Sequence, residues 1–117
     1  MKTITVEDLK KKIDANEDFI LVDVLSNESY ENKHIPKAIN LPINELEQRA
    51  PNELPDKNKE VIVYCGSTQC LAPPRAAKKL EELGYTNVVD FESGLAGWKE
   101  AGYGFEGSVA WFFLYLY

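Results

Sequence analysis

The chain has 117 residues, of which 44% are hydrophobic and 27% are charged, and its formal net charge is −6. This length fits one domain with a single core, and the composition is that of a globular protein rather than a disordered or fibrous one. The acidic balance argues against a nucleic-acid partner, because binding to phosphate backbones needs clustered Lys and Arg. The amino-terminal stretch lacks the apolar run of a secretory signal, so we expect a cytoplasmic protein.

The first half of the sequence alternates helical and strand patterns. Thr5 and Asp8 have the spacing of a helix cap, and Val6, Leu9 and Ile13 then fall on one helical face. We therefore expect, in chain order, a helix after Thr5, a strand at 19–24, a short helical turn, a strand at 38–40 and a helix at 43–50, followed by a polar loop.

The second half continues this alternation. The apolar runs at 61–64 and 87–91, like the one at 19–24, are typical of strands buried on both faces. Such strands form a parallel sheet with helices on both sides. Pro74 suits the first position of a helix, where its missing N–H would be unpaired in any case. We expect a strand at 61–64, a helix from Pro74 to Gly84, a strand at 87–91 and a helix at 93–102.

The two cysteines of the chain, Cys65 and Cys70, lie in the loop after the strand at 61–64. Open α/β sheets bind ligands at the edge where the strands end and such loops begin. Loop N–H groups and a helix dipole favour anions there. We therefore expect the pKa of the Cys65 thiol to fall below its ordinary value of about 8.5, which would make it a nucleophilic thiolate. Spacing alone leaves open the alternative that Cys65 is an inert buried cysteine.

Three stretches carry a resemblance to a known family. "LVDVLSNESYENKHIPKAINLP", "VIVYC" and "AAKKLEELGYTNVVDFESGLAGWKEAGY" occur in the order and spacing of a single-domain rhodanese, which they resemble over roughly residues 5–105. The resemblance implies an α/β fold, a three-layer sandwich with a central parallel sheet flanked by helices. We expect one rhodanese-like domain at 1–107 and an apolar aromatic tail at 108–117.

The resemblance also implies a sulfurtransferase. Cys65 would take sulfane sulfur from thiosulfate or a persulfide as a Cys65 persulfide, and pass it to a thiol or other nucleophilic acceptor, which could be a protein. No cofactor or metal is implied. The substrate-binding loop would form a backbone cradle for an anion, and its predicted members are Gly66, Ser67, Thr68, Gln69, Leu71, Ala72 and Arg75.

The sequence departs from the usual rhodanese pattern in this loop. The segment "CGSTQCLAPPRAA" is longer than usual, and residues 65–74 contain no Lys or Arg. Thiosulfate is a dianion, so we expect weak capture of free thiosulfate. Arg75 could partly replace the missing charge, or it could be a solvated residue of the helix face. Elsewhere Leu25 replaces a common Arg, and the positions of three family glycines hold Lys33, Lys37 and Ser93.

The role of Cys70 is open at this point. It could be a resolving thiol that attacks a Cys65 persulfide and leaves an internal disulfide, or it could contact the substrate or the loop backbone. Cysteine phosphatases need Arg six positions after the cysteine, where this chain has Leu71, so phosphatase chemistry is disfavoured. A thiol redox protein and a non-catalytic rhodanese-like partner-binding module are the alternative functions.

Other candidate residues favour structural roles. We expect His34, the only histidine, to fix a loop by hydrogen bonding, Asp23 to orient backbone N–H groups, and Trp98 to lie in the core. The segment "VAWFFLYLY" at 109–117 is far shorter than the roughly 20 residues of a membrane-spanning helix. It could fold back onto the domain, serve as a surface for self-association or for a partner, stay disordered or contact a membrane.

Overall fold

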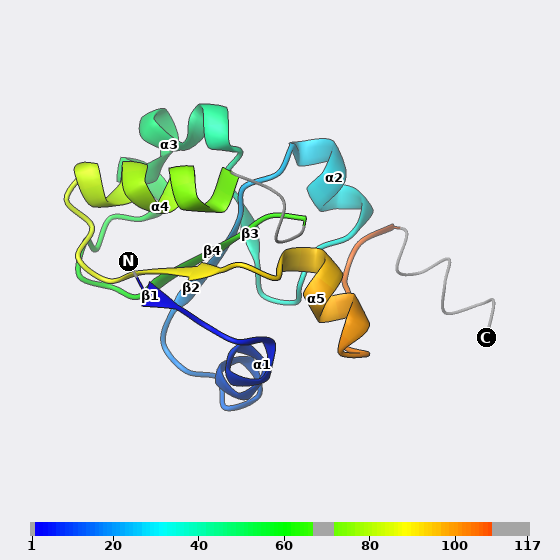
Figure 1. The fold of residues 1–117 in the computed structure, drawn as a ribbon. Coiled ribbons are helices and arrows are strands. Elements are labelled where there is room, and N and C mark those ends of the chain that lie inside the picture. Colours follow the sequence, from blue (N-terminus) through cyan, green and yellow to red (C-terminus); the bar gives the residue numbers. More distant parts are fainter. Residues whose placement is uncertain (1, 67–71, 109–117) are drawn as a thin grey trace.

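The computed structural model describes residues 2–66 and 72–108. It contains a five-stranded parallel sheet of order β1-β5-β4-β2-β3 (Figure 1). The elements are, in chain order, β1 (Lys2–Thr3), α1 (Val6–Asp14), β2 (Ile20–Asp23), α2 (Asn27–Asn32), β3 (Ile39–Asn40), the 3-10 helix η1 (Ile43–Glu45), α3 (Leu46–Glu53), β4 (Val61–Tyr64), α4 (Ala72–Glu82), β5 (Val88–Phe91) and α5 (Gly94–Glu100).

Helices cover both faces of the sheet. One face packs against α3 and α4, and the other packs against α1 and α5 (Figure 1). Neighbouring side chains along a strand point to opposite faces, so Val61 and Val63 enter the first core while Ile62 and Tyr64 enter the second. Every residue of β4 is therefore buried. The predicted parallel sheet between two helical layers is confirmed.

The first helix follows the predicted pattern. The Thr5 hydroxyl accepts a hydrogen bond from the backbone N–H of Asp8 at 3.2 Å and so caps α1. Leu9 is fully buried, and Val6 and Ile13 pack against the same core. The cap and the apolar face expected from the sequence are confirmed.

Two boundaries of the predicted helices are wrong. Helix α4 begins at Ala72 and not at Pro74, which makes Ala72 the first residue of a helix rather than part of a loop. Pro73 and Pro74 fit inside the first helical turn because its N–H groups have no helical partners. Helix α3 continues to Glu53 through Pro51, which the sequence had placed in the loop.

Contacts beyond the helix explain the extension of α3. Leu54 is fully buried, and its N–H bonds to the Ala50 carbonyl at 2.7 Å. The Tyr85 hydroxyl lies within hydrogen-bond distance of the carbonyl oxygens of Ala50 and Leu54 and shares its one proton between them. These tertiary contacts outweigh the single helical hydrogen bond that Pro51 removes.

The sequence did not predict β1. This strand has two exposed residues, Lys2 and Thr3, which pair with Val89 and Asp90 at the edge of the sheet. Two residues are too short for a periodic pattern. The other elements begin or end within one or two residues of the expected positions, a difference that is common at element ends.

Candidate active site

Cys65 lies directly after β4, which has a strand on each side in the sheet. It is 2% exposed and packs in the core that faces α3 and α4, while Gly66 is half-buried. The carboxyl ends of all five parallel strands meet at this edge, where α/β sheets place their ligands. The predicted nucleophile therefore occupies the predicted place in the fold.

Helix α5 holds the backbone of the cysteine. The N–H of Leu95 donates to the Cys65 carbonyl at 3.0 Å, and the N–H of Ala96 donates to the Gly66 carbonyl at 2.8 Å. These amides lie in the first turn of α5, where N–H groups have no partner within the helix. The first turn of α5 is thus used to fix Cys65 and Gly66.

Gly94 allows this close contact. Its φ is +59°, and a Cβ atom built on it would lie 2.3 Å from the Cys65 carbonyl oxygen. Any other residue would clash with the backbone of Cys65 and would also adopt an unfavourable left-handed conformation.

A buried carboxylate organises the neighbouring strand end. Asp23 is fully buried, and its two oxygens accept hydrogen bonds from the Leu25 N–H at 2.8 Å and from the Tyr64 hydroxyl at 2.9 Å. The Tyr64 hydroxyl in turn accepts the Ile35 N–H at 3.1 Å. Burial raises the pKa of Asp23, and burial together with the Asp23 charge raises that of Tyr64. Asp23 orients backbone and hydroxyl groups, as predicted.

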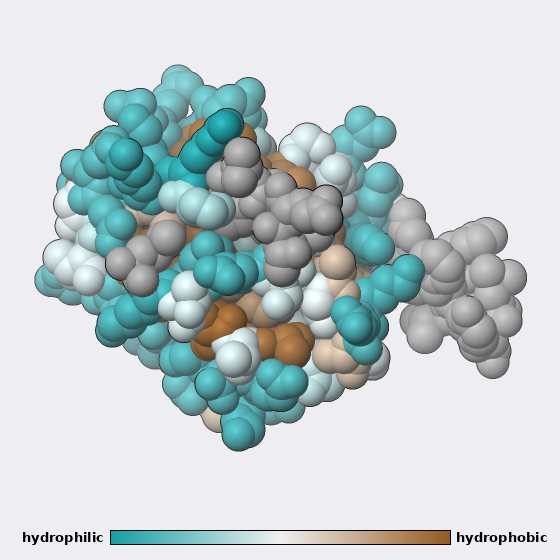
Figure 2. All heavy atoms as spheres, viewed as in Figure 1, coloured by the Kyte–Doolittle hydropathy of each residue, from teal (hydrophilic) through white to brown (hydrophobic). Residues whose placement is uncertain are grey.

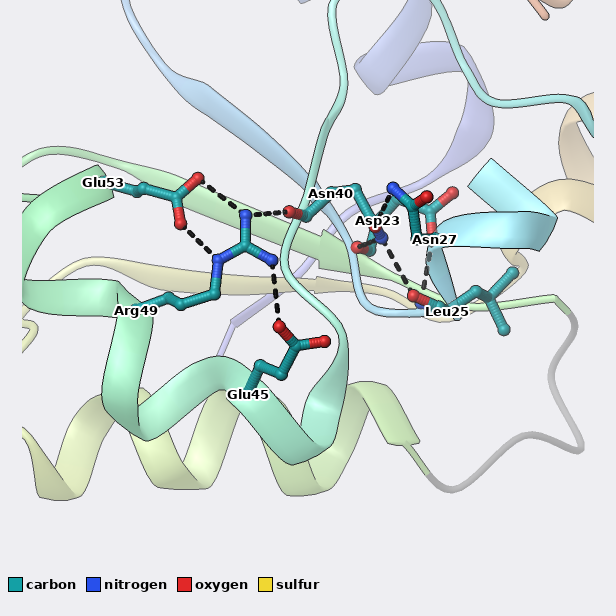
Figure 3. A network of polar contacts seen from close by, with 7 residues as sticks. All are labelled: Asp23, Leu25, Asn27, Asn40, Glu45, Arg49 and Glu53. Atoms are coloured by element: carbon teal, nitrogen blue, oxygen red, sulfur yellow. Dashed lines mark hydrogen bonds and ion pairs between the residues drawn. The ribbon is translucent and has the colours of Figure 1, made fainter. Parts of the chain in front are cut away.

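Asn40 joins this strand end to α3 (Figure 3). Its side-chain amide nitrogen donates to the backbone carbonyl oxygens of Asp23 at 3.0 Å and Leu25 at 2.8 Å. The backbone carbonyl of Asn40 accepts a hydrogen bond from Arg49 at 3.3 Å. Arg49 also forms ion pairs with Glu45 and Glu53. The guanidinium of Arg49 is therefore neutralised by acidic neighbours within its own helical segment.

Only part of the predicted substrate loop lies in the described residues. Ser67, Thr68, Gln69, Cys70 and Leu71 lie outside them, as does the segment 109–117. Ala72 opens α4, so its backbone belongs to a helical N-terminus and not to the predicted loop. Arg75 is exposed in the first turn of α4 and forms no ion pair with a described residue.

The residues with predicted structural roles behave as expected. The Nδ1 atom of His34 lies 2.7 Å from the Tyr30 carbonyl oxygen, and its ring stacks on Tyr30 with centroids 3.8 Å apart. Trp98 is 1% exposed in the core and donates to the Gly104 carbonyl at 2.8 Å. Lys37, at the position of a family glycine, has a φ of +76°.

Surface features add few candidates. The face shown in Figure 2 is mainly hydrophilic, and apolar residues show there only in small separate areas. Among the described residues, no group of His, Cys, Asp or Glu side chains could hold a metal ion. In the same part of the chain, no helix combines the length and apolar character that crossing a membrane requires.

The sequence reading missed several residues that build this site. Asn40, Tyr64 and Gly94 act through contacts with residues far away in the chain, which no local pattern reveals. For Asn40, its place as a polar residue at the end of a buried strand is the signal that could have found it.

Comparison with known proteins gives consistent results. The model of the rhodanese-like domain family matches residues 5–101. PspE of Escherichia coli, named as a thiosulfate sulfurtransferase, is 39% identical over 67 residues, which cover 57% of this chain and 62% of PspE. YrkF of Bacillus subtilis, provisionally named as a sulfur carrier protein, is 34% identical over 95 residues, which cover 81% of this chain and 49% of YrkF.

The crystal structure of the BH2092 protein from Bacillus halodurans is also similar, with a TM-score of 0.86, 31% identity and coverage of 92% of this chain and 78% of that one. The chain spans about half the length of YrkF and about three fifths of PspE. At the level of the family, these relatives support a sulfurtransferase. Because the family model covers most of the sequence, the chain belongs to the rhodanese-like domain family.

Proposed function

We propose that the protein is a sulfurtransferase that carries sulfane sulfur as a persulfide on Cys65. The observation that carries this proposal is the place of Cys65 at the carboxyl end of β4, with its carbonyl held by the N–H of Leu95. The similarity to PspE, named as a thiosulfate sulfurtransferase, supports the same chemistry.

The reaction consists of two balanced displacements. The Cys65 thiolate attacks the outer sulfur of the donor, the sulfur–sulfur bond of the donor breaks, and the leaving group takes its electron pair. With thiosulfate the products are the Cys65 persulfide anion and sulfite. An acceptor thiolate then attacks the outer sulfur of the persulfide, and the Cys65 thiolate leaves. The enzyme returns to its starting state without a further oxidant or reductant.

Burial supports the persulfide role of Cys65. Cys65 is 2% exposed, so its side chain has little contact with bulk water. The backbone cradle from Gly66 to Ala72 and the charge of Arg75 would bind the anionic part of the donor. A catalytic thiol at Cys65 would suit a reducing compartment, in keeping with the cytoplasmic placement expected from the amino-terminal sequence.

Cys70 is proposed as a resolving thiol. Its thiolate would attack the Cys65 sulfur of the persulfide and release hydrosulfide, and the resulting disulfide would need a dithiol reductant to reopen.

Self-association through the segment 109–117 is a separate proposal. Sedimentation of the full chain against a chain ending at Gly107, over a range of concentrations, tests it.

Turnover by cysteine variants tests the proposed function. Sulfur transfer from thiosulfate or a hydropersulfide to a small thiol is measured for the wild type, Cys65→Ser and Cys70→Ser. We expect Cys65→Ser to be inactive and Cys70→Ser to keep transfer to an external thiol. Equal activity of Cys65→Ser and wild type would overturn the proposal. Loss of activity in both variants, with a wild type that only forms an internal disulfide, would favour a thiol redox protein.

A further inference from the structure

We propose that the sulfur donor of this site is an organic hydropersulfide, R–S–SH, and that Leu25 and Ile43 contact its carbon skeleton. This inference rests on the proposed function and adds the chemical class of the donor. The class has two sources, a small-molecule hydropersulfide and a persulfide on a cysteine of another protein.

Leu25 stands next to the strand end that carries Cys65. The N–H of Val24 donates to the Tyr64 carbonyl at 3.1 Å, so the chain after β2 continues alongside the end of β4. Leu25 is half-buried and contacts the cores on both faces of the sheet. An apolar side chain therefore borders the approach to the cysteine.

The backbone of Leu25 is fixed at both polar atoms. Its N–H donates to Asp23, and its carbonyl accepts from the Asn40 amide. Figure 3 shows the Leu25 side chain pointing away from Asn40 and Arg49. The position of this apolar group is thus set in advance, which lowers the entropic cost of a contact with a ligand.

Ile43 provides a second apolar group at the same edge. Its N–H donates to the Val24 carbonyl at 3.1 Å, which brings it beside the residue that precedes Leu25. Ile43 is 36% exposed, which is more than any other large hydrophobic side chain among the described residues. Leu25 and Ile43 therefore flank Val24 at the strand end next to Cys65.

Charges at this edge do not favour a dianion. Arg49 is occupied by two carboxylates, and Arg75, in the first turn of α4, is an exposed cation without an ion pair among the described residues. Glu28 and Glu92, which follow β2 and β5, are exposed and have no ion pair within the described ranges. Capture of a dianion needs charge-assisted hydrogen bonds, whereas an organic group gains from apolar contact.

The transfer step from this donor is balanced. The Cys65 thiolate attacks the outer sulfur of R–S–SH, and the S–S bond of the donor breaks. The products are the Cys65 persulfide, which keeps the proton of the outer sulfur, and the thiolate R–S⁻. No oxidant, reductant or second substrate is required.

Donor selectivity of variants tests this inference. The reduced protein is loaded with thiosulfate or with benzyl hydropersulfide, and the rate constant for persulfide formation on Cys65 is measured for each donor. The ratio of the two rate constants is then compared between each variant and the wild type, because the intrinsic reactivity of each donor cancels in that comparison. We expect Leu25→Arg to shift the ratio about tenfold towards thiosulfate. Ile43→Ser should lower the rate with benzyl hydropersulfide about threefold. Leu83→Arg, a half-buried leucine at the opposite edge, is the matched control and should leave the ratio unchanged.

The outcomes separate this inference from the proposed function. If wild type loads Cys65 but neither Leu25→Arg nor Ile43→Ser changes the ratio, the inference is overturned and the proposed function stands. If neither donor loads Cys65, both fall. Thermal unfolding shows whether Leu25→Arg is folded, and the more exposed Ile43 provides the test if it is not. Persulfidated serum albumin as a third donor distinguishes the sources, because a rate above that of benzyl hydropersulfide indicates a protein donor.

Discussion

The two edges of the sheet use their polar groups in different ways. At the carboxyl edge, buried side chains bond to backbone, as Asp23 does to the Leu25 N–H and Asn40 to the Leu25 carbonyl. At the amino edge, charged side chains bond to one another near the surface, as Lys12 does to Glu60 at 2.8 Å. Buried bonds to backbone fix geometry, whereas exposed ion pairs contribute little to stability. The carboxyl edge also carries ion pairs from Arg49 to Glu45 and Glu53, but its buried bonds to backbone fix the chain next to Cys65.

The amino edge also holds a shallow groove of about 400 Å³ between β1 and α1. Both acidic and basic side chains line it, among them Lys2, Asp8, Lys12 and Glu60. The groove lies at the opposite end of the strands from Cys65 and is not part of the candidate active site. The candidate active site is therefore assigned from the position of Cys65 and not from this groove.

Loss of Asp23 should have the largest effect. Asp23→Ala leaves the Leu25 N–H and the Tyr64 hydroxyl buried without their acceptor, so we expect a loss of about 3 kcal/mol in the free energy of unfolding. Urea denaturation measures it. Asp23→Asn keeps one acceptor oxygen and should cost less. Equal stability of Asp23→Ala and wild type would show that this contact does not organise the carboxyl edge.

Gly94→Ala should disturb the backbone of Cys65 directly. The new Cβ would lie 2.3 Å from the Cys65 carbonyl oxygen at a positive φ, so we expect a loss of about 2 kcal/mol and at least about tenfold slower persulfide formation. Gly104→Ala is the matched control, because a Cβ there meets no atom within 4 Å. The account would be contradicted if the two variants formed the persulfide equally fast.

Asp90 should make stability depend on pH. Burial, with a smaller effect of the Glu92 charge, raises its pKa to about 6, and its Oδ1 has no partner among the described residues. The folded state therefore binds the proton more tightly than the unfolded state, so stability is highest below about pH 4 for this group and falls as pH rises through about 6. From about pH 5 to about pH 8 the loss should be about 1.4 kcal/mol.

The variant Asp90→Asn isolates this dependence. Asn does not titrate, so its unfolding free energy should fall less over the same pH range, although Asp23, whose pKa is also raised, still contributes. Urea denaturation at a series of pH values compares the two slopes. Parallel slopes for Asp90→Asn and wild type would refute the raised pKa of Asp90.

Lys37→Gly should have the smallest effect, and it should stabilise. Lys37 has a φ of +76°, which costs a residue with a side chain more than glycine. Relief of this backbone strain, about 1–2 kcal/mol, should outweigh the lost hydrogen bond from Lys37 to the Asn16 side chain and the greater unfolded-state entropy of glycine, so we expect a net gain of about 0.5 kcal/mol. Lys33→Gly, at a φ of −161°, is the control and should not stabilise. A lower melting temperature for Lys37→Gly would contradict this.

The sequence was sufficient for the layers of the fold and for the place of Cys65. Continuous apolar runs gave the parallel strands, and the cap at Thr5 gave the start of α1. It was insufficient for β1, which is too short for a pattern, and for the end of α3, which depends on Tyr85 from a distant part of the chain.

The same limit applies to the site. The sequence singled out Asp23 and Cys65 because each follows or ends a buried apolar run. It missed the hydrogen bond from α5 to the Cys65 carbonyl and the hydrogen bonds of the Asn40 side chain, since these join residues from different strands and helices. Nothing in local spacing distinguishes Gly94, whose conformation and contact with Cys65 exist only in the folded chain.

The central claim is that Cys65 carries sulfur, and intact-protein mass spectrometry tests it most directly. The reduced wild type, Cys65→Ser and Cys70→Ser are exposed to benzyl hydropersulfide, and the modified peptide is then identified. We predict the mass of one extra sulfur atom on residue 65 in the wild type and in Cys70→Ser, and none in Cys65→Ser. A wild type that never gains sulfur and only loses two hydrogens between its cysteines would contradict the account.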